Sequence, residues 1–366
     1  MPGFIPGLEL NRQYYEACIK PIIEQDFPGL RYGAALIGYG SDVLGYDTER
    51  SQDHEWGPRL LLFLAEDDFP RLTPALDARL RERLPPEFLG YSTAFSARDP
   101  AGVRLMTEAR RGNVSHHIDF WTERMFFETT LGWDGTAPPT PELWLSFPSQ
   151  RLLEATAGAV FHDELGTLST ARHRLSWYPD GVWRYLLACQ WTRIAQEEAF
   201  VGRCHEVDDA LGERLTTARL VRDILRLAFL LERRYAPYSK WLGTAFDRLP
   251  VAATMGPDLI RAIADPVWEE RQAALHRACA ETVKRFNQLS LVPEMPTQVS
   301  WFYDRPYWVI HADRIADALI ASLGSDPAAS LYRQRGLVGS VDQLSDNTDF
   351  LADFRLTRAF GALFEE

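Results

Sequence analysis

The sequence predicts an α+β protein, in which a small mixed sheet with helices is followed by an all-α helical bundle. Residues 31–41, 58–68, 88–96 and 113–122 are short apolar runs bounded by Gly, Pro or polar residues, as is typical of strands. Beyond residue 180, long stretches place apolar residues at i, i+3, i+4 and i+7, as amphipathic helices do. A chain of 366 residues also exceeds what one core usually organises, so two domains are expected.

The first expected domain covers residues 1–135. Residues 8–25 carry apolar side chains at helical spacing and stop before a Pro-Gly pair, which predicts a helix. A second helix is expected after residue 67, ending at a Pro-Pro stop. Helices and strands therefore alternate through this part of the chain, as in an α/β layer.

The second expected domain, a helical bundle, covers residues 143–366. Gly, Thr and Pro replace any periodic pattern at 132–142, which marks the boundary. Helices are predicted at 183–204, 211–242 and 266–289, where charged residues separate regularly spaced apolar ones.

Composition limits the partners of the protein. There are 39 Lys and Arg against 51 Asp and Glu, a net charge of −12, which disfavours a nucleic-acid partner and favours cationic ligands and divalent metals. The four cysteines form no Cys-x-x-Cys pair, so no zinc knuckle is indicated. No apolar run reaches the ~18 residues of a membrane span, and no signal peptide opens the chain. We expect a cytoplasmic protein without a membrane partner.

Three acidic residues predict a metal site. Asp53 and Glu55 stand two apart before the strand at 58–68, and strand alternation would point both to one face. Two carboxylates so close call for a divalent cation with oxygen ligands. Asp119, alone between apolar neighbours, offers a third carboxylate if its strand lies beside that one. Two Mg²⁺ ions, or Mn²⁺, could then clamp the oxygens of a displacement at phosphorus.

A glycine-serine turn precedes these acids. Gly40 lets backbone N–H groups approach a phosphate, and Ser41 can donate from its hydroxyl. Arg59, at the start of the following strand, could grip a phosphate bidentately or extend along the edge of the site. The sequence leaves both roles of Arg59 open.

The order Gly40, Ser41, a loop, the Asp53-x-Glu55 pair, a strand and then Asp119 resembles the nucleotidyltransferase superfamily typified by DNA polymerase β and antibiotic nucleotidyltransferases. The phrases "GSDVLGYDTERSQDHEWGPR" and "RYAPYSKW" are similar to the DUF4037 branch. The resemblance implies that the Gly-Ser turn binds a nucleoside triphosphate, that the acid pair binds two magnesium ions, and that Asp119 is the third ligand or a general base.

The second domain offers further candidates. "LLERRYAPYSKWL" breaks a helix at its proline and holds Glu232, Tyr238 and Lys240. Lys240 resembles a lysine that reaches the nucleotide phosphates in antibiotic nucleotidyltransferases with a helical second domain. "QEEAF" adds Glu197 and Glu198. The four residues other than Lys240 are candidates for binding the acceptor or deprotonating its hydroxyl.

The sequence thus predicts a nucleotidyltransferase that moves a nucleoside monophosphate, AMP from ATP, to a hydroxyl of an acceptor by a two-metal mechanism. The acceptor is a small cationic molecule or a hydroxyl of a partner protein, and a transfer-RNA end is disfavoured by charge. The alternative is a catalytically weak or inactive nucleotide-binding regulatory module, because the acid motif is altered: Glu replaces the commoner Asp, and Trp-Gly-Pro separates it from its strand.

Overall fold

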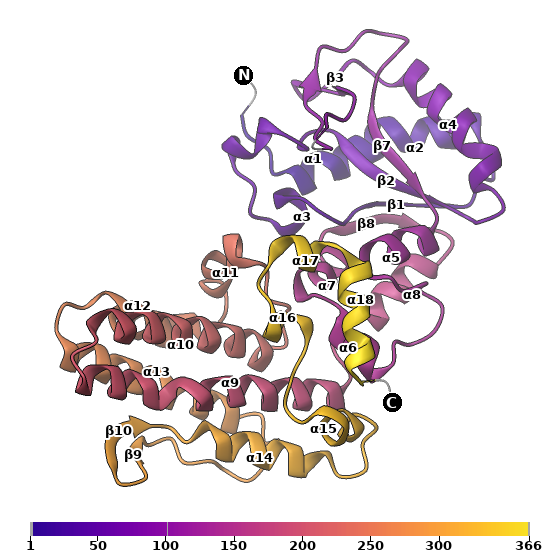
Figure 1. Ribbon diagram of the computed structural model, residues 1–366. Coiled ribbons are helices and arrows are strands. Elements are labelled where there is room, and N and C mark those ends of the chain that lie inside the picture. Colours follow the sequence, from indigo (N-terminus) through magenta and orange to yellow (C-terminus); the bar gives the residue numbers. More distant parts are fainter. Residues whose placement is uncertain (1–2, 101, 365–366) are drawn as a thin grey trace. The chain divides into compact units, whose positions relative to one another are not determined.

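The computed structural model describes residues 3–100 and 102–364. The chain divides into two compact units, each described here by itself (Figure 1). The first comprises Met1–Pro138 and Arg151–Ser176, and the second Pro139–Gln150 and Trp177–Glu366. The first contains a mixed sheet with helices and the second is mostly helical, so the predicted α+β class is confirmed.

A mixed sheet of four strands organises the first unit. Its order is β7-β2-β1-β8, with β1 antiparallel to both neighbours and β2 parallel to β7. The strands are β1 (Tyr32–Leu36), β2 (Arg59–Leu64), β7 (His117–Trp121) and β8 (Ala159–Asp163). Because β2 and β7 are neighbours, with Leu61 opposite Asp119, the strand pairing expected from the sequence is confirmed.

The division of the chain into two units differs from the boundary predicted at 132–142, because strand β8 belongs to the first unit. Residues 151–176 return to the first unit because β8 pairs with β1, with Gly33 opposite Asp163. Arg172 fixes this return by donating to three carbonyl oxygens at the end of α7 (Ser149–Thr156). The residues of β8 are only half-buried, and its apolar run, Ala159 to Phe161, is too short to predict a strand from the sequence.

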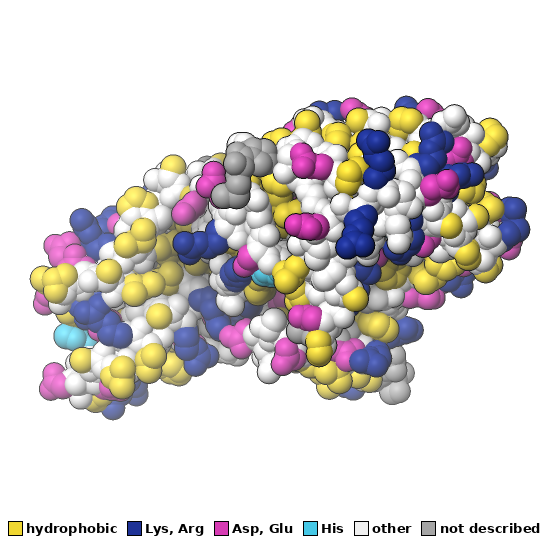
Figure 2. Space-filling view, turned by 90° about the horizontal axis from the view of Figure 1, so that it is seen from above, with side chains coloured by type: hydrophobic (Ala, Val, Ile, Leu, Met, Phe, Trp, Pro, Cys, Tyr) yellow, Lys and Arg dark blue, Asp and Glu magenta, His cyan; other side chains and the backbone are white. Residues whose placement is uncertain are grey.

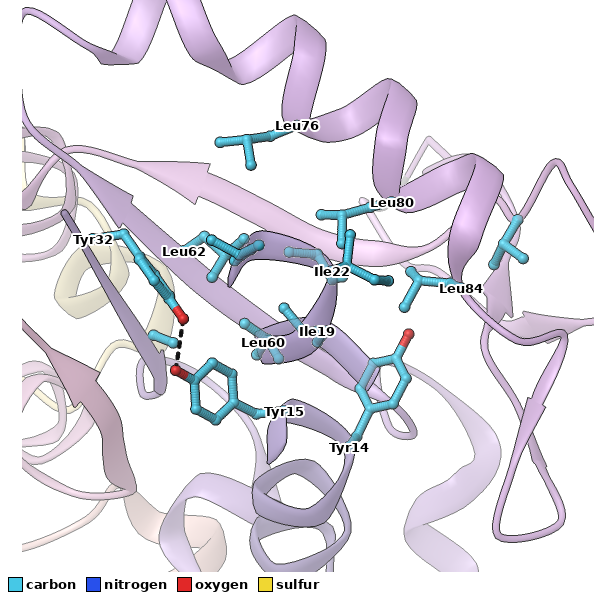
Figure 3. Packing of buried hydrophobic residues seen from close by; sticks show 14 of the residues in the cluster. Tyr14, Tyr15, Ile19, Ile22, Tyr32, Leu60, Leu62, Leu76, Leu80 and Leu84 are labelled. Atoms are coloured by element: carbon cyan, nitrogen blue, oxygen red, sulfur yellow. Dashed lines mark hydrogen bonds between the residues drawn. The ribbon is translucent and has the colours of Figure 1, made fainter. Parts of the chain in front are cut away.

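The core of the first unit lies between the sheet and two helical segments, residues 7–26 and 69–83 (Figure 3). The predicted helix at 8–25 is present as α1 (Gly7–Tyr14), a π-helical turn (Tyr15–Ile19) and α2 (Lys20–Asp26). Leu76 and Leu80 of α4 (Phe69–Arg83) belong to the same core and point toward Leu62 of β2. The hydroxyls of Tyr15 and Tyr32 meet at 2.8 Å, so both buried phenols have a hydrogen-bond partner.

The predicted strand at 88–96 is instead three short pieces. β3 (Glu87–Phe88) and β4 (Tyr91–Ser92) form a hairpin, and β5 (Ala94–Phe95) pairs with β6 (Met106–Thr107). Leu89 and Gly90 both have positive φ, at 49° and 86°, which turns the chain back on itself. Local backbone conformation therefore overrides the apolar pattern here.

The second unit is built mainly from helices. The principal ones are α9 (Asp180–Glu206), α10 (Ala210–Leu231), α11 (Ser239–Phe246), α12 (Ala252–Ala264), α13 (Trp268–Asn287) and α14 (Ala312–Leu323). A hairpin of β9 (Ser300–Phe302) and β10 (Arg305–Val309) precedes α14. The predicted helix at 211–242 is two helices, as the break expected at its proline implies, but the break begins earlier, because the chain leaves α10 through Arg233, whose φ is +51°.

The C-terminal segment packs on the helices of the second unit. Gln343, in α16 (Val341–Leu344), donates to the Leu186 carbonyl and the Gln190 side chain at 3.0 Å each, and Arg193 donates to the Gln343 carbonyl. These buried bonds attach residues near 343 to α9.

Within the described residues, no helix is both long and apolar enough to cross a membrane. The face shown in Figure 2 carries Lys and Arg side chains beside Asp and Glu, with apolar groups between them. Positive and negative charges are thus interspersed on this face.

Candidate functional site

Glu55 and Asp119 meet in the first unit. His117 Nε2 lies 3.5 Å from Glu55 Oε2 and 3.6 Å from Asp119 Oδ2. Arg98 also contacts both, with Nη1 3.8 Å from Glu55 Oε1 and Nη2 3.4 Å from Asp119 Oδ2. Two carboxylates distant in sequence therefore share the same two neighbours. We call these four residues, together with Tyr39 and Arg104, the acid-pair cluster.

Glu55 is held in a fixed and strained conformation. Its φ is +50°, which is uncommon for a residue with a side chain. Its backbone N–H donates to the Arg104 carbonyl at 2.9 Å, and its Oε1 accepts from the Arg104 N–H at 2.7 Å. Its Oε2 accepts from the Tyr39 hydroxyl at 2.9 Å. Strain that is held in place by several surrounding bonds is often found at functional sites.

Asp119 stays ionised at neutral pH. Burial alone would raise the pKa of its carboxyl, but the hydrogen bond from His117 and the charges of Arg104 and Arg98 bring that pKa below its usual value. Burial lowers the pKa of His117, so its imidazole is neutral at pH 7. The two arginines therefore supply the positive charge beside the two carboxylates.

Asp53 does not join this cluster. It ends a 3₁₀ turn (Glu49–Asp53), its side chain is 62% exposed, and its carboxylate contacts His54 Nδ1 at 2.9 Å. The predicted common face of Asp53 and Glu55 required extended backbone. The 3₁₀ turn and the left-handed Glu55 interrupt that alternation, and β2 begins only at Arg59.

Glu55 and Asp119 are the carboxylates of the cluster that could hold a divalent cation. Among the described residues, no group of three or more His, Cys, Asp or Glu side chains is placed to hold a metal ion. Magnesium, however, is usually held by one or two carboxylates together with water and substrate phosphates. Glu55 and Asp119 offer two such ligands, whereas the three-acid, two-ion arrangement expected from the sequence is not assembled.

The Gly40-Ser41 turn lies next to the acid pair, because Tyr39 precedes it directly and donates to Glu55. Gly40 has a φ of +130°, and a Cβ there would overlap Asp42 Oδ1 and Arg59 Nη2. Only glycine fits this position. Ser41 is half-buried, and its hydroxyl makes no hydrogen bond within the described part of the chain.

Arg59 is a buried structural residue. It is 3% exposed, and its Nε and Nη2 donate to the two oxygens of Asp42 at 3.2 and 2.7 Å. Nη2 also donates to the Tyr39 carbonyl at 3.0 Å. The side chain therefore attaches the glycine turn to β2, and neither of the two roles that the sequence suggested for Arg59 corresponds to this position.

Glu197 and Glu198 have partners inside the second unit. Glu198 accepts from the backbone N–H groups of Ile310 and Ala312 at 2.7 and 3.1 Å, which fixes the start of α14. Burial raises the pKa of this carboxyl to about 7. Glu197 forms an ion pair with Arg219. These contacts anchor neighbouring elements of the second unit.

The residues around the helix break are also engaged within the second unit. Glu232 accepts from Arg285 Nε and Nη2 at 2.8 and 3.1 Å. The Tyr238 N–H donates to Gln150 at 3.0 Å. Lys240 Nζ lies 4.9 Å from the ring centroid of Trp241.

Four residues of the cluster were not candidates in the sequence: Tyr39, Arg98, Arg104 and His117. His117 could have been found, because it stands two residues before Asp119 and so shares its face of β7. The two arginines lie in an irregular stretch with no periodic signal, so only the folded chain reveals them.

Part of the chain matches a known protein family. Residues 144–242 match the model of the family described as a domain of unknown function, DUF4037. The match supports the similarity to that branch for this stretch, which runs from α6 (Pro141–Ser146) into α11. It does not include Gly40, Glu55 or Asp119. No curated protein and no solved structure matches the chain.

Proposed function

We propose that this protein is a nucleotidyltransferase that moves a nucleoside monophosphate, AMP from ATP, to a hydroxyl of an acceptor. The supporting observation is that Glu55 and Asp119 meet beside the Gly40-Ser41 turn, to which Tyr39 links them. This is the arrangement that the resemblance to the nucleotidyltransferase superfamily implies, with two of its three acids assembled.

In this proposal each part of the site has a separate task. The glycine turn and the Ser41 hydroxyl face the phosphates, and the two carboxylates hold one Mg²⁺ or Mn²⁺ ion. A bound divalent cation would neutralise charge on the phosphates and polarise the phosphorus under attack. Asp119 suits the role of ligand better than that of general base, because its lowered pKa keeps it ionised and makes it a weak base.

We rank the two candidate acceptors by the net charge of the protein. The net charge of −12 favours a small cationic molecule, and a hydroxyl of a partner protein is second. Both acceptors are compatible with transfer from a triphosphate.

The test is release of pyrophosphate from labelled nucleoside triphosphates with Mg²⁺ or Mn²⁺ and candidate acceptors. We expect release and acceptor labelling with the wild-type protein and loss of both with Asp119→Asn. Asp67→Asn is the matched control, because Asp67 is exposed and makes no ion pair within the described residues. Equal activity of wild type and Asp119→Asn would contradict the proposal.

A second candidate is a nucleotide-binding module without turnover. It is favoured by the position of Asp53 outside the cluster and by the neutralisation of both carboxylates by Arg98 and Arg104. Binding of ATP with Mg²⁺, without pyrophosphate release for any acceptor, would select this candidate over the transferase.

A further inference from the structure

Arg98 and Arg104 contact the acid pair loosely. Their shortest distances to Asp119 are 3.4 and 3.6 Å, longer than those of close charge-assisted hydrogen bonds. The side chain of Arg98 is 43% exposed and that of Arg104 is 22% exposed. Both guanidinium groups thus keep N–H donors that the carboxylates do not use.

The main chain of Arg104 is fixed by Glu55, whereas its guanidinium group makes only a long contact, of 3.6 Å, with Asp119. The backbone N–H and carbonyl of Arg104 are both bonded to Glu55, at 2.7 and 2.9 Å. Arg98 Nη1 donates to the Gly102 carbonyl at 2.9 Å. The Arg104 side chain can therefore change partner by rotamer changes while its backbone stays bonded to Glu55.

The two arginines stand where a divalent cation would also be required. Two guanidinium groups balance the charge of Glu55 and Asp119, as one divalent ion would. Arginine and metal would repel each other if both stayed beside the same carboxylates. Guanidinium groups bind phosphate oxygens bidentately, so a triphosphate offers them alternative partners.

We propose that Arg98 and Arg104 exchange partners when a triphosphate binds. Both arginines leave Glu55 and Asp119 and bind the phosphate groups, so both carboxylates become free to bind the divalent cation. This inference rests on the proposed triphosphate site and adds its regulation. Cation and triphosphate then bind cooperatively, and by linkage each strengthens the binding of the other. Without a triphosphate, the arginines keep the cation affinity low.

The first experiment measures Mn²⁺ binding alone, without nucleotide, by electron paramagnetic resonance. Arg98→Gln/Arg104→Gln should bind Mn²⁺ at least about tenfold more tightly than wild type. Arg110→Gln/Arg111→Gln is the matched control, because both arginines are exposed, lie in the same stretch and make no ion pair within the described residues. The control should bind as wild type does. Equal Mn²⁺ affinity in all three proteins would overturn the inference.

Two further variants locate the effect. Adding Glu55→Gln to the double variant should remove the gain in Mn²⁺ affinity, and retention of the gain would place the cation elsewhere and overturn the inference. If the double variant does not fold, Arg98→Gln alone serves, because Arg98 is the more exposed arginine. It should show a smaller gain of the same sign, and no gain would count against the inference.

The second experiment measures inorganic triphosphate binding with EDTA present. Wild type and the control should bind alike, and Arg98→Gln/Arg104→Gln at least about tenfold more weakly. Unchanged affinity in the double variant would overturn the inference. Failure of the transferase proposal is distinguishable: shifts in both binding experiments without pyrophosphate release support the arginine exchange alone, and release without either shift supports the transferase alone.

Discussion

Two groups of opposite charges lie next to each other in the first unit and differ in construction. The pair Asp42–Arg59 has contacts of 2.7 and 3.2 Å, and its side chains are 1% and 4% exposed. Glu55 and Asp119 share Arg98 at 3.4 to 3.8 Å, and their side chains are 11% and 24% exposed. The first pair is closed to any other ligand, whereas the second is loose and partly open to solvent.

The difference separates charges that hold the fold from charges available for chemistry. Asp42 and Arg59 use their polar atoms on each other and on the turn that contains Gly40. Glu55 and Asp119 lie next to that turn but are balanced by groups that can leave. The buried pair therefore gives the loose cluster a rigid base, as a functional site needs.

Replacing Asp42 by Ala should have the largest effect of the changes considered. It leaves the Arg59 guanidinium buried without a counter-charge, which typically costs about 3–5 kcal/mol. Urea unfolding would measure this loss in the free energy of unfolding. The exposed-site control Asp67→Asn should change that free energy by less than about 0.5 kcal/mol. A similarly small change for Asp42→Ala would show that the buried pair is not what holds the turn.

Glu55→Gln and Asp119→Asn should reduce nucleotidyl transfer at least about a hundredfold, because a cation ligand contributes several kcal/mol of charge stabilisation in the transition state. Folding should be retained, since the ion pairs that each variant loses are long, at 3.4 to 3.8 Å, and partly exposed, and such pairs contribute little stability. The initial rate of pyrophosphate release and the thermal midpoint together check this. Loss of activity through loss of folding would make these acids structural, like Asp42.

The sequence predicts the outline of the first unit but not the details of its site. The runs that became β1 and β2 are apolar and bounded by turns, and alternation within β7 places His117 and Asp119 on one face. The prediction that Asp53 and Glu55 share one face is wrong, because a 3₁₀ turn ends at Asp53 and Glu55 itself has a left-handed backbone conformation. Arg98 reaches the acids only through tertiary folding, for which no local pattern exists.

Prediction from the sequence has similar limits in the second unit. The long helices α9, α10 and α13 follow from periodicity alone. The sequence makes Glu198 a candidate for binding the acceptor or deprotonating its hydroxyl. The structure instead gives it two backbone N–H donors at the start of α14, a contact that depends on chain far away in sequence.

Glu198→Gln tests whether a buried acid of the second unit is purely structural. The pKa of Glu198 is about 7 in the folded protein, above the unfolded value of 4.5. Between these pH values Glu198 loses its proton in the unfolded chain but keeps it in the folded protein. The free energy of unfolding therefore falls as pH rises, by about 1–3 kcal/mol. Gln does not ionise, so the variant should gain in unfolding free energy relative to wild type from pH 4.5 to 7. Urea unfolding at several pH values would show this, and a difference independent of pH would contradict it.

Asp53→Asn should have the smallest effect. The Asp53 side chain is 62% exposed, and its one ion-pair contact within the described part of the chain is with His54, so the free energy of unfolding should change by less than about 0.5 kcal/mol. Pyrophosphate release should fall much less than in Asp119→Asn. Complete loss of transfer with intact folding would mean that Asp53 joins the acids during catalysis and would restore the two-ion site.

The most direct test is calorimetric titration of a non-hydrolysable ATP analogue with and without Mg²⁺. We expect tight binding that depends on Mg²⁺ in the wild-type protein, and loss of this dependence in Glu55→Gln and Asp119→Asn but not in Asp67→Asn. Binding that responds to Mg²⁺ equally in all four proteins would contradict a cation site formed by Glu55 and Asp119.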